Sequence, residues 1–402
     1  MLYRPKLSNG KVVPLSWPIA ICSLLNGICW PLEDNAMMWS KVLDRSYFFL
    51  FIIVFAQNNL AQFRYLIANY DDIDKLLVDM PAYLVQTETA FCCVYFGLFK
   101  HQFKKIMQKF YNSIYIEQST NTTLFQSIQN KMRPTFYNSA NYFITMVVFL
   151  ATPFVNLIIH QRRDLVYAMI YPFDYTPLYL YLPIVFMSMW FSFINCTLTF
   201  SGATVMAEIM LHLNGRYLLL GENLQRSSIE LLKVATGDTI SWKFSQELKQ
   251  IVRRNVELNK FAAEFQKFFS FRIFMIFSFA AVVMCVVGFK IYTNFSESLP
   301  FIIWMLSKLV EILALGEVGS TLIATTNDIS YMYYNSNWEL IISRSTNSRE
   351  NIKLMKLLVV AIESNRKPFI LKGLNFFSVS LTAVLSILQG AASYFTCLIS
   401  FH

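Results

Sequence analysis

The sequence predicts an all-α, polytopic membrane protein with seven transmembrane helices, a cytosolic amino terminus, an extracellular carboxyl terminus and helical cytosolic extensions. Hydrophobic residues make up 55% of the 402 residues and charged residues only 15%, whereas soluble domains average about 25% charged residues. Seven stretches are as long and apolar as the roughly 20 residues that a spanning helix needs. Lys and Arg gather in alternate connections between these stretches, which indicates the orientation.

Each predicted span is an apolar stretch with few charges or none. The first, third, fourth and seventh carry no Asp, Glu, Lys or Arg, and the second carries Asp79 and Glu88. The sixth carries Lys308, Glu311 and Glu317. The seven spans cover residues 46–63, 76–99, 135–159, 178–207, 268–289, 299–326 and 373–401.

Two connections, residues 208–267 and 327–372, are expected to form a helical anchor region in the cytosol. The first contains a heptad seam with Asn255 as its one polar member, a residue type that sets helix register. The second contains a shorter apolar stripe at Ile352, Met355, Val359 and Ile362. We expect the two helices to pack together, within one subunit or between subunits. The seam comprises Phe244, Leu248, Ile251, Asn255, Leu258, Ala262, Phe265 and Phe269.

The distribution of basic residues predicts which side faces the cytosol. Most of the 34 Lys and Arg precede the first span or lie between spans two and three, four and five, or six and seven. The positive-inside rule therefore places these regions in the cytosol, against the anionic inner leaflet. The other three connections hold only Arg64, Lys75, Arg162, Arg163 and Lys290.

The residue patterns argue against catalysis, cofactor chemistry and nucleic-acid binding. The four His residues are scattered, the seven Cys lie mostly in apolar stretches without metal-ligand spacing, and no glycine-rich phosphate loop is present. The net charge of +9 arises mainly in loops that flank apolar spans, so the bilayer is the expected partner rather than nucleic acid. We expect neither catalytic nor metal-binding residues.

Aromatic and sulfur-containing residues cluster in the outer halves of spans two, three, four and six. Together they predict an apolar pocket for a small ligand, although ordinary helix packing is the alternative for any single member. The charged residues Glu88, Lys308 and Glu311 indicate either a polar functional site or a neutralised cluster that joins helices. The ligand-binding candidates are Tyr83, Phe143, Met146, Phe149, Tyr179, Phe186, Met187, Trp190, Ile303 and Leu306.

The last span predicts a gate formed by several subunits. Small residues from Gly390 to Ser393 permit close approach of helices. Cys397 and Phe401 lie four residues apart and so share one face of the helix. If several subunits bring this face together, it forms an apolar ring that can gate by dewetting.

This ending resembles the signature of the insect chemoreceptor superfamily, which is Thr-Tyr, five apolar residues and Gln-Phe. Here Ser393-Tyr394 and Ser400-Phe401 have that spacing. Ser in place of Thr looks like the odorant-receptor branch, whereas Ser in place of Gln departs from the signature. The segment with Tyr331, Tyr334, Asn335, Ser336 and Trp338, followed by Pro368 and Gly373, is also similar to odorant receptors.

The resemblance implies an odour-gated, non-selective cation channel in the dendritic plasma membrane of an olfactory neuron. A tuning subunit of this kind assembles with a shared co-receptor as a heterotetramer and detects small, volatile, mostly apolar molecules. By position, Cys397, Ser400 and Phe401 correspond to the gate region. A gustatory receptor of the same superfamily is the nearest alternative. A G-protein-coupled receptor conflicts with the predicted orientation, and a transporter lacks its paired repeats here.

Overall fold

The computed structural model describes residues 2–159, 161–234, 237, 239–293 and 295–401, and nearly all regular structure in them is helical. This confirms the prediction of an all-α membrane fold. The elements are α1 (Trp17–Leu25), α2 (Met38–Ala68), α3 (Ile73–Leu98), α4 (Lys100–Lys109), the π-helix η1 (Phe110–Ile114), α5 (Thr122–Ile159), α6 (Leu178–Val234), α7 (Ile240–Thr293), α8 (Phe295–Tyr334), α9 (Trp338–Ser343), α10 (Ser348–Ser364), β1 (Lys372–Gly373), β2 (Phe377–Ser378) and α11 (Leu381–Phe401).

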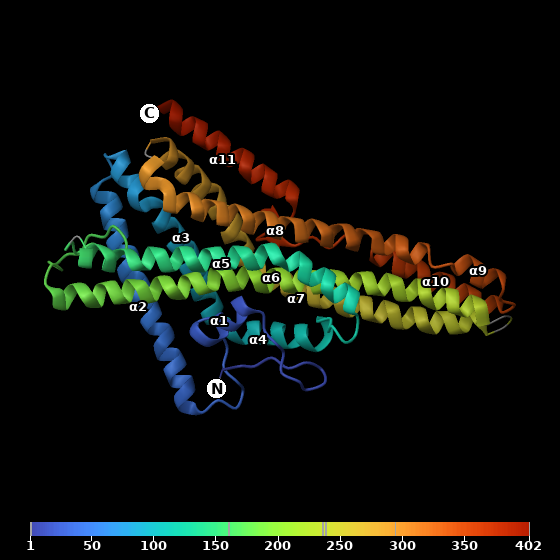
Figure 1. Cartoon of the computed structure of the whole chain (residues 1–402). Helices are drawn as coiled ribbons and strands as arrows, with labels where there is room; N and C mark the ends of the chain where they lie inside the picture. Colours follow the sequence, from blue (N-terminus) through green and yellow to red (C-terminus); the bar gives the residue numbers. More distant parts are fainter. Residues whose placement is uncertain (1, 160, 235–236, 238, 294, 402) are drawn as a thin grey trace.

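Four long helices, α5 to α8, form the body of the molecule and lie side by side (Figure 1). α6 has 57 residues, and at about 1.5 Å per residue it is roughly 86 Å long, far more than the ~30 Å of a bilayer core. The fourth predicted span and the start of the predicted anchor region are therefore one continuous helix. The same holds for α7, which joins the anchor seam to the fifth span without a break.

Three of the described helices are long and apolar enough to cross a membrane: the segments Thr122–Ile159, Leu178–Lys233 and Ile240–Thr293. α3 passes the same test together with α4 and η1, as a pair bent by 78°. α11 contains a shorter apolar segment. The structure is therefore that of a helical membrane protein, and the number of seven spans stays a prediction.

The helices at one end of the molecule pack as a bundle within this chain. Every member of the heptad seam in α7 is buried. Its polar member, Asn255, donates to the hydroxyl of Tyr333 at 3.3 Å and to Oδ1 of Asn365 at 2.8 Å, which ties α7 to α8 and to the end of α10. The seam is thus buried by helices of the same chain.

The apolar stripe predicted on α10 is the buried face only at Ile362, which packs against the core; the other three positions were wrong. α10 buries Leu354, Leu358 and Ala361, whereas Ile352, Met355 and Val359 of the expected stripe are exposed. Both faces of this helix carry apolar residues, so their spacing alone did not distinguish the face that meets α7.

The amino-terminal segment folds against the long helices. α1 packs on α6, and the side chain of Asn26 donates to the carbonyl of Ile194 and to Oγ1 of Thr197, both at 3.0 Å. Further along, Lys104 of α4 donates to the carbonyl of Leu32 at 2.9 Å. The amino-terminal segment is therefore packed into the fold rather than detached from it.

At the other end of the chain, the last helix begins at Leu381 rather than at residue 373, where the seventh span was expected to start. Residues of β1 and β2 form a small antiparallel ribbon instead. Leu374 and Asn375 between them have positive φ angles of 45° and 64°, which are turn conformations and not helical ones. Apolar composition alone did not reveal this turn.

The start of α11 and the backbone that leads into it lie close against α8 at two glycines. A Cβ atom on Gly319 would lie 2.1 Å from the carbonyl oxygen of Val379. One on Gly316 would lie 2.8 Å from the side chain of Val384. Only glycine lets the two backbones approach this closely.

We predict that Gly319→Ala destabilises the protein by about 1–3 kcal/mol, as overpacking of a close contact does. The matched control is Gly288→Ala, where the added Cβ would meet the Phe395 ring at an ordinary 3.4 Å; it should be neutral or slightly stabilising, because alanine favours helix. Thermal unfolding of the detergent-solubilised variants measures both effects. Equal unfolding midpoints for the two variants would contradict the close approach of the backbone at Gly319.

Candidate functional site

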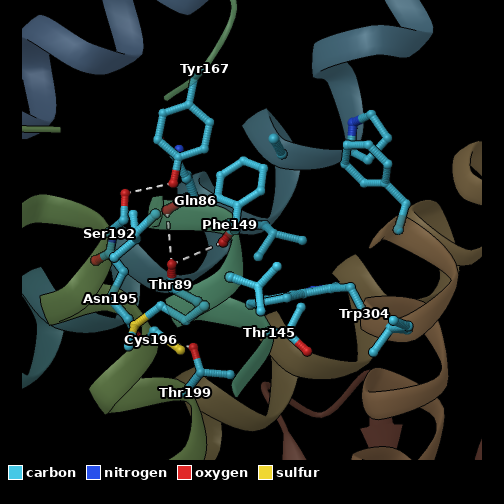
Figure 2. Close-up of a pocket in the computed structure, with 18 of the residues that line it drawn as sticks. Gln86, Thr89, Thr145, Phe149, Tyr167, Ser192, Asn195, Cys196, Thr199 and Trp304 are labelled. Carbon is cyan, nitrogen blue, oxygen red and sulfur yellow. Dashed lines mark hydrogen bonds between the residues drawn. The ribbon is translucent and has the colours of Figure 1, made fainter. Parts of the chain in front are cut away.

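A cavity of about 370 Å³ lies between α3, α5, α6, α7 and α8 (Figure 2). It occupies the halves of these helices that are remote from the bundle formed by α9 and α10. α3, α5, α6 and α8 correspond to spans two, three, four and six, among which the sequence predicted a pocket. The lining residues are Pro81, Ala82, Val85, Gln86, Thr89, Asn141, Ile144, Thr145, Met146, Val148, Phe149, Leu150, Thr152, Tyr167, Ser192, Asn195, Cys196, Thr199, Val283, Val287, Phe301, Ile303 and Trp304.

Most hydroxyl groups on the cavity wall are already satisfied by their own helices. Thr89 donates to the carbonyl of Val85 at 2.9 Å, and Thr145 to that of Asn141 at 2.8 Å. Thr199 likewise donates to the carbonyl of Asn195 at 3.1 Å. Hydroxyls bound to the backbone in this way present mainly their carbon atoms to the cavity. The wall is therefore chemically more apolar than its composition indicates.

The segment between α5 and α6 covers one side of the cavity. Tyr167 from this segment forms a 2.6 Å hydrogen bond with the hydroxyl of Ser192, and its ring packs on Phe149 at 5.4 Å between centroids. The backbone N–H of Ala168 donates to Oδ1 of Asp79 at 3.2 Å. These contacts hold an extended segment over the cavity and join it to three helices.

The structure brings three of the ten ligand-binding candidates to the cavity wall: Met146, Phe149 and Ile303. The other seven lie elsewhere, because only one side of each helix faces the cavity. The side chains of Tyr83 and Trp190 turn toward α2, where they bond Asn59 and Tyr47. Phe143 packs on Phe200, and the remaining four are exposed: Tyr179, Phe186, Met187 and Leu306.

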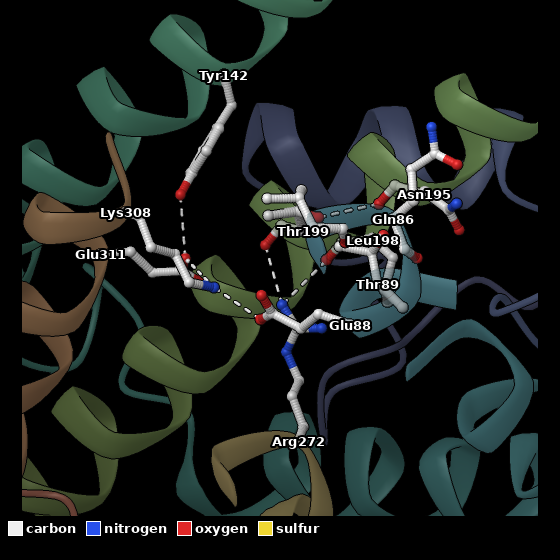
Figure 3. Close-up of polar contacts among 11 residues, drawn as sticks. Gln86, Glu88, Thr89, Tyr142, Asn195, Leu198, Thr199, Arg272, Lys308 and Glu311 are labelled. Atoms are coloured by element: carbon white, nitrogen blue, oxygen red, sulfur yellow. Dashed lines mark hydrogen bonds and ion pairs between the residues drawn. The ribbon is translucent and has the colours of Figure 1, made fainter. Parts of the chain in front are cut away.

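Four buried charged residues form a cluster close to the cavity (Figure 3). Lys308 Nζ lies 2.7 Å from Oε1 of Glu88 and 3.3 Å from Oε2 of Glu311. The hydroxyl of Tyr142 donates to the same Glu311 oxygen at 3.1 Å. The guanidinium of Arg272 donates to the carbonyls of Leu198 and Thr199 at 3.3 and 3.0 Å. Two cations and two anions thus lie together, and they connect α3, α5, α6, α7 and α8.

Arg272 is a member of the charge cluster that the sequence analysis did not identify. It lies inside the fifth predicted span, and glycine at position 202 makes room for it, because a Cβ there would lie 2.6 Å from the guanidinium carbon. A lone Arg in an apolar stretch was a usable signal, since intramembrane charges are functional or structural by default. Asn195, Tyr167 and Trp304 were also missed as wall residues, and no periodic pattern distinguishes them.

The gate candidates lie near the end of α11. Cys397 and Ser400 are exposed, and the hydroxyl of Ser400 donates to the carbonyl of Cys397 at 2.7 Å. The side chain of Phe401 is outside the described part of the chain. No other described element covers Cys397 or Ser400, so this end of α11 is open to contact outside the chain.

The fold and the cavity together define a helical membrane protein with an internal, mostly apolar cavity. The family model described as 7tm Odorant receptor matches residues 72–392. Odorant receptor 74a of Drosophila melanogaster is 42% identical over 98% of this chain and 98% of its own length. Odorant receptor 35a of the same species is 37% identical over 99% of this chain and 97% of its own. The chain belongs to the 7tm odorant receptor family.

A solved structure shows the same fold. The insect olfactory receptor OR5 from Machilis hrabei, in complex with eugenol, matches with a TM-score of 0.78 at 15% identity, over 96% of this chain and 98% of its own. The family assignment confirms the resemblance seen in the last span and the prediction of a receptor rather than an enzyme. It also selects the odorant receptor over the gustatory receptor, the G-protein-coupled receptor and the transporter.

The charge cluster predicts a large stability effect. Lys308→Met leaves two buried carboxylates without their cation and should destabilise the protein by about 3–5 kcal/mol. Lys353→Met is the matched control, because Lys353 forms an exposed ion pair with Glu350 on α10 and such pairs contribute less than about 1 kcal/mol. Unfolding midpoints of the solubilised variants test the difference. A Lys308→Met protein as stable as the control would show that the charge cluster does not stabilise the fold.

Proposed function

We propose that this chain is the odour-binding subunit of an odour-gated, non-selective cation channel, which it forms with a shared co-receptor as a heterotetramer. In this proposal it resides in the dendritic plasma membrane of an olfactory sensory neuron and detects small, volatile, mostly apolar molecules. The family assignment supports the receptor role, and the eugenol complex of OR5 supports a small organic ligand.

The observation that carries the proposal is the cavity itself. At about 30 Å³ for each water-sized atom, its volume of about 370 Å³ accommodates roughly a dozen heavy atoms. A ligand of about ten heavy atoms can reach micromolar affinity, or about −8 kcal/mol, by burial alone. Saturated hydroxyls and aromatic rings give the wall the chemistry that such a ligand requires.

The orientation in the membrane follows from the basic residues. With seven spans and the Lys- and Arg-rich regions in the cytosol, the bundle of α9 and α10 lies inside the cell and the cavity lies in the outer half of the membrane. An odour molecule then enters from the outer side. The carboxyl end of α11 also reaches the outer side.

Exposed surfaces on α10 and α11 support assembly with further subunits. Leu385 and Tyr394 on α11 are exposed, as are Met355 and Val359 on α10. We propose that α11 helices of neighbouring subunits line the pore, with Cys397, Ser400 and Phe401 at its gate, and that α10 takes part in contacts in the cytosol. Ligand binding opens the pore only if the ligand binds the open state more tightly, because equal affinity for both states shifts no population.

We predict that this chain, expressed together with the co-receptor, gives an odour-evoked cation current that persists when G-protein signalling is blocked. Ions cross the pore directly, so no second messenger is required. Whole-cell recording with a panel of volatile molecules, with and without the block, measures this. Cells that express the co-receptor alone are the control. Loss of the current under the block would refute the channel.

We predict that Phe401→Ala changes conductance or ion selectivity and leaves the order of odour preference intact, because its position is at the gate. Met146→Ala is the reciprocal comparison, since Met146 lines the cavity; it should alter preference, with shifts of about tenfold, or ~1.4 kcal/mol, and leave permeation intact. Recordings of both variants with the same odours and ions separate the two roles. Changed preference with unchanged permeation in Phe401→Ala would move the pore elsewhere.

A further inference from the structure

One polar side chain on the cavity wall differs from the others. Asn195 of α6 is 3% exposed and lines the cavity, next to Cys196 and close to Ser192 and Thr199 (Figure 2). Both its amide nitrogen and its amide oxygen lack a hydrogen-bond partner among the described residues. The hydroxyls around it are satisfied by helix carbonyls or, for Ser192, also by Tyr167.

An unpartnered amide in an apolar site is costly, because it has given up its hydrogen bonds with water without replacing them. A ligand that supplies both a donor and an acceptor removes this cost. A ligand without them leaves it in place. Sites built to bond a polar group therefore discriminate strongly against analogues that lack it.

We propose that Asn195 sets the ligand chemistry of this receptor by hydrogen bonding to a hydroxyl group, so that the preferred ligands are small aliphatic or aromatic alcohols. The inference rests on the proposed function and deepens it. A hydroxyl accepts from the amide nitrogen and donates to the amide oxygen, a carbonyl group satisfies only the nitrogen, and a hydrocarbon satisfies neither. Because both amide atoms are free, either orientation of the amide leads to the same conclusion.

The other wall residues determine the size and polarity of the rest of the ligand. Met146, Phe149, Ile303 and Trp304 offer carbon, sulfur and aromatic surface around the cavity. One hydroxyl on an apolar body of up to roughly a dozen heavy atoms therefore matches the space and the chemistry together. Gln86 also lines the cavity, but its amide oxygen accepts from Gln62 at 3.2 Å and only its amide nitrogen lacks a partner among the described residues, so Asn195 is the wall residue with both a free donor and a free acceptor.

Two probes of equal heavy-atom count, 1-octanol and nonane, test the assignment on the receptor co-expressed with the co-receptor. We expect 1-octanol to act at a concentration about tenfold lower than nonane. Asn195→Leu should raise the half-maximal concentration of 1-octanol about tenfold and leave that of nonane unchanged or lower. A preserved nonane response also shows that the variant folds and reaches the membrane.

Asn214→Leu is the matched control. Asn214 lies on the same helix, is buried and also has an amide oxygen without a partner among the described residues, but it does not line the cavity. The same substitution there should leave the ratio between the two probes unchanged. If Asn195→Leu and Asn214→Leu shift the ratio equally, the effect is not one of direct contact and the assignment fails.

Binding to the purified receptor separates this inference from the channel proposal. Thermal stabilisation of the solubilised protein by each probe needs no ion current. Stronger stabilisation by 1-octanol than by nonane, abolished by Asn195→Leu, supports the role of Asn195 even if no current is found, in which case only the channel proposal fails. Equal stabilisation by the two probes, or none by either, overturns the role of Asn195 whatever the currents show.

Discussion

Neutralisation of buried charge among the helices is the constraint on which the rest of this structure depends. A single ammonium group, that of Lys308, lies within ion-pairing distance of carboxylates from α3 and α8. Arg272 adds a second cation and uses the carbonyls of α6 as acceptors. A buried charge without such partners costs several kcal/mol. The five helices that surround the cavity are therefore held in register by electrostatics, where apolar packing in lipid provides little specificity.

The need for hydrogen-bond partners in an apolar environment also makes the cavity wall largely apolar. In an apolar medium each polar side chain must find an acceptor close by, and for Ser and Thr on a helix the carbonyl one turn earlier is the nearest. The wall of this cavity follows that rule at Thr89, Thr145 and Thr199. What remains open to a ligand is mainly carbon, sulfur and aromatic surface, with the amide groups of Gln86, Asn141 and Asn195 among them. Specificity in such a site arises from shape and from very few polar contacts.

Much of the fold could be predicted from the sequence, and less of the site. Apolar length and the heptad steps identified the helical class and the buried seam of α7, because both depend on local periodicity. The start of α11 was placed too early, since two positive φ angles at Leu374 and Asn375 leave no mark on hydropathy. Of the candidate ligand contacts, Met146, Phe149 and Ile303 line the cavity, whereas Tyr179 and Trp190 do not. The faces of a membrane helix that meet a cavity, lipid or another helix are all largely apolar, so sequence alone does not tell them apart. The partnership of Arg272 with Gly202 is likewise tertiary and joins residues on two helices.

α8 is one continuous helix of 40 residues that carries three features. Trp304 forms part of the cavity wall, Lys308 and Glu311 belong to the charge cluster, and Gly319 seats α11. The first and last of these are separated by roughly 22 Å along the helix axis at about 1.5 Å per residue, with no proline between them. The helices that line the cavity should therefore differ in how freely their wall residues can be exchanged during evolution. An exchange at Met146 or Phe149 of α5, which line the cavity, alters the site alone, whereas an exchange on α8 that tilts or rotates the helix also disturbs the charge cluster and the last helix. Receptors that share this arrangement should therefore vary more freely at such positions of α5 than along α8.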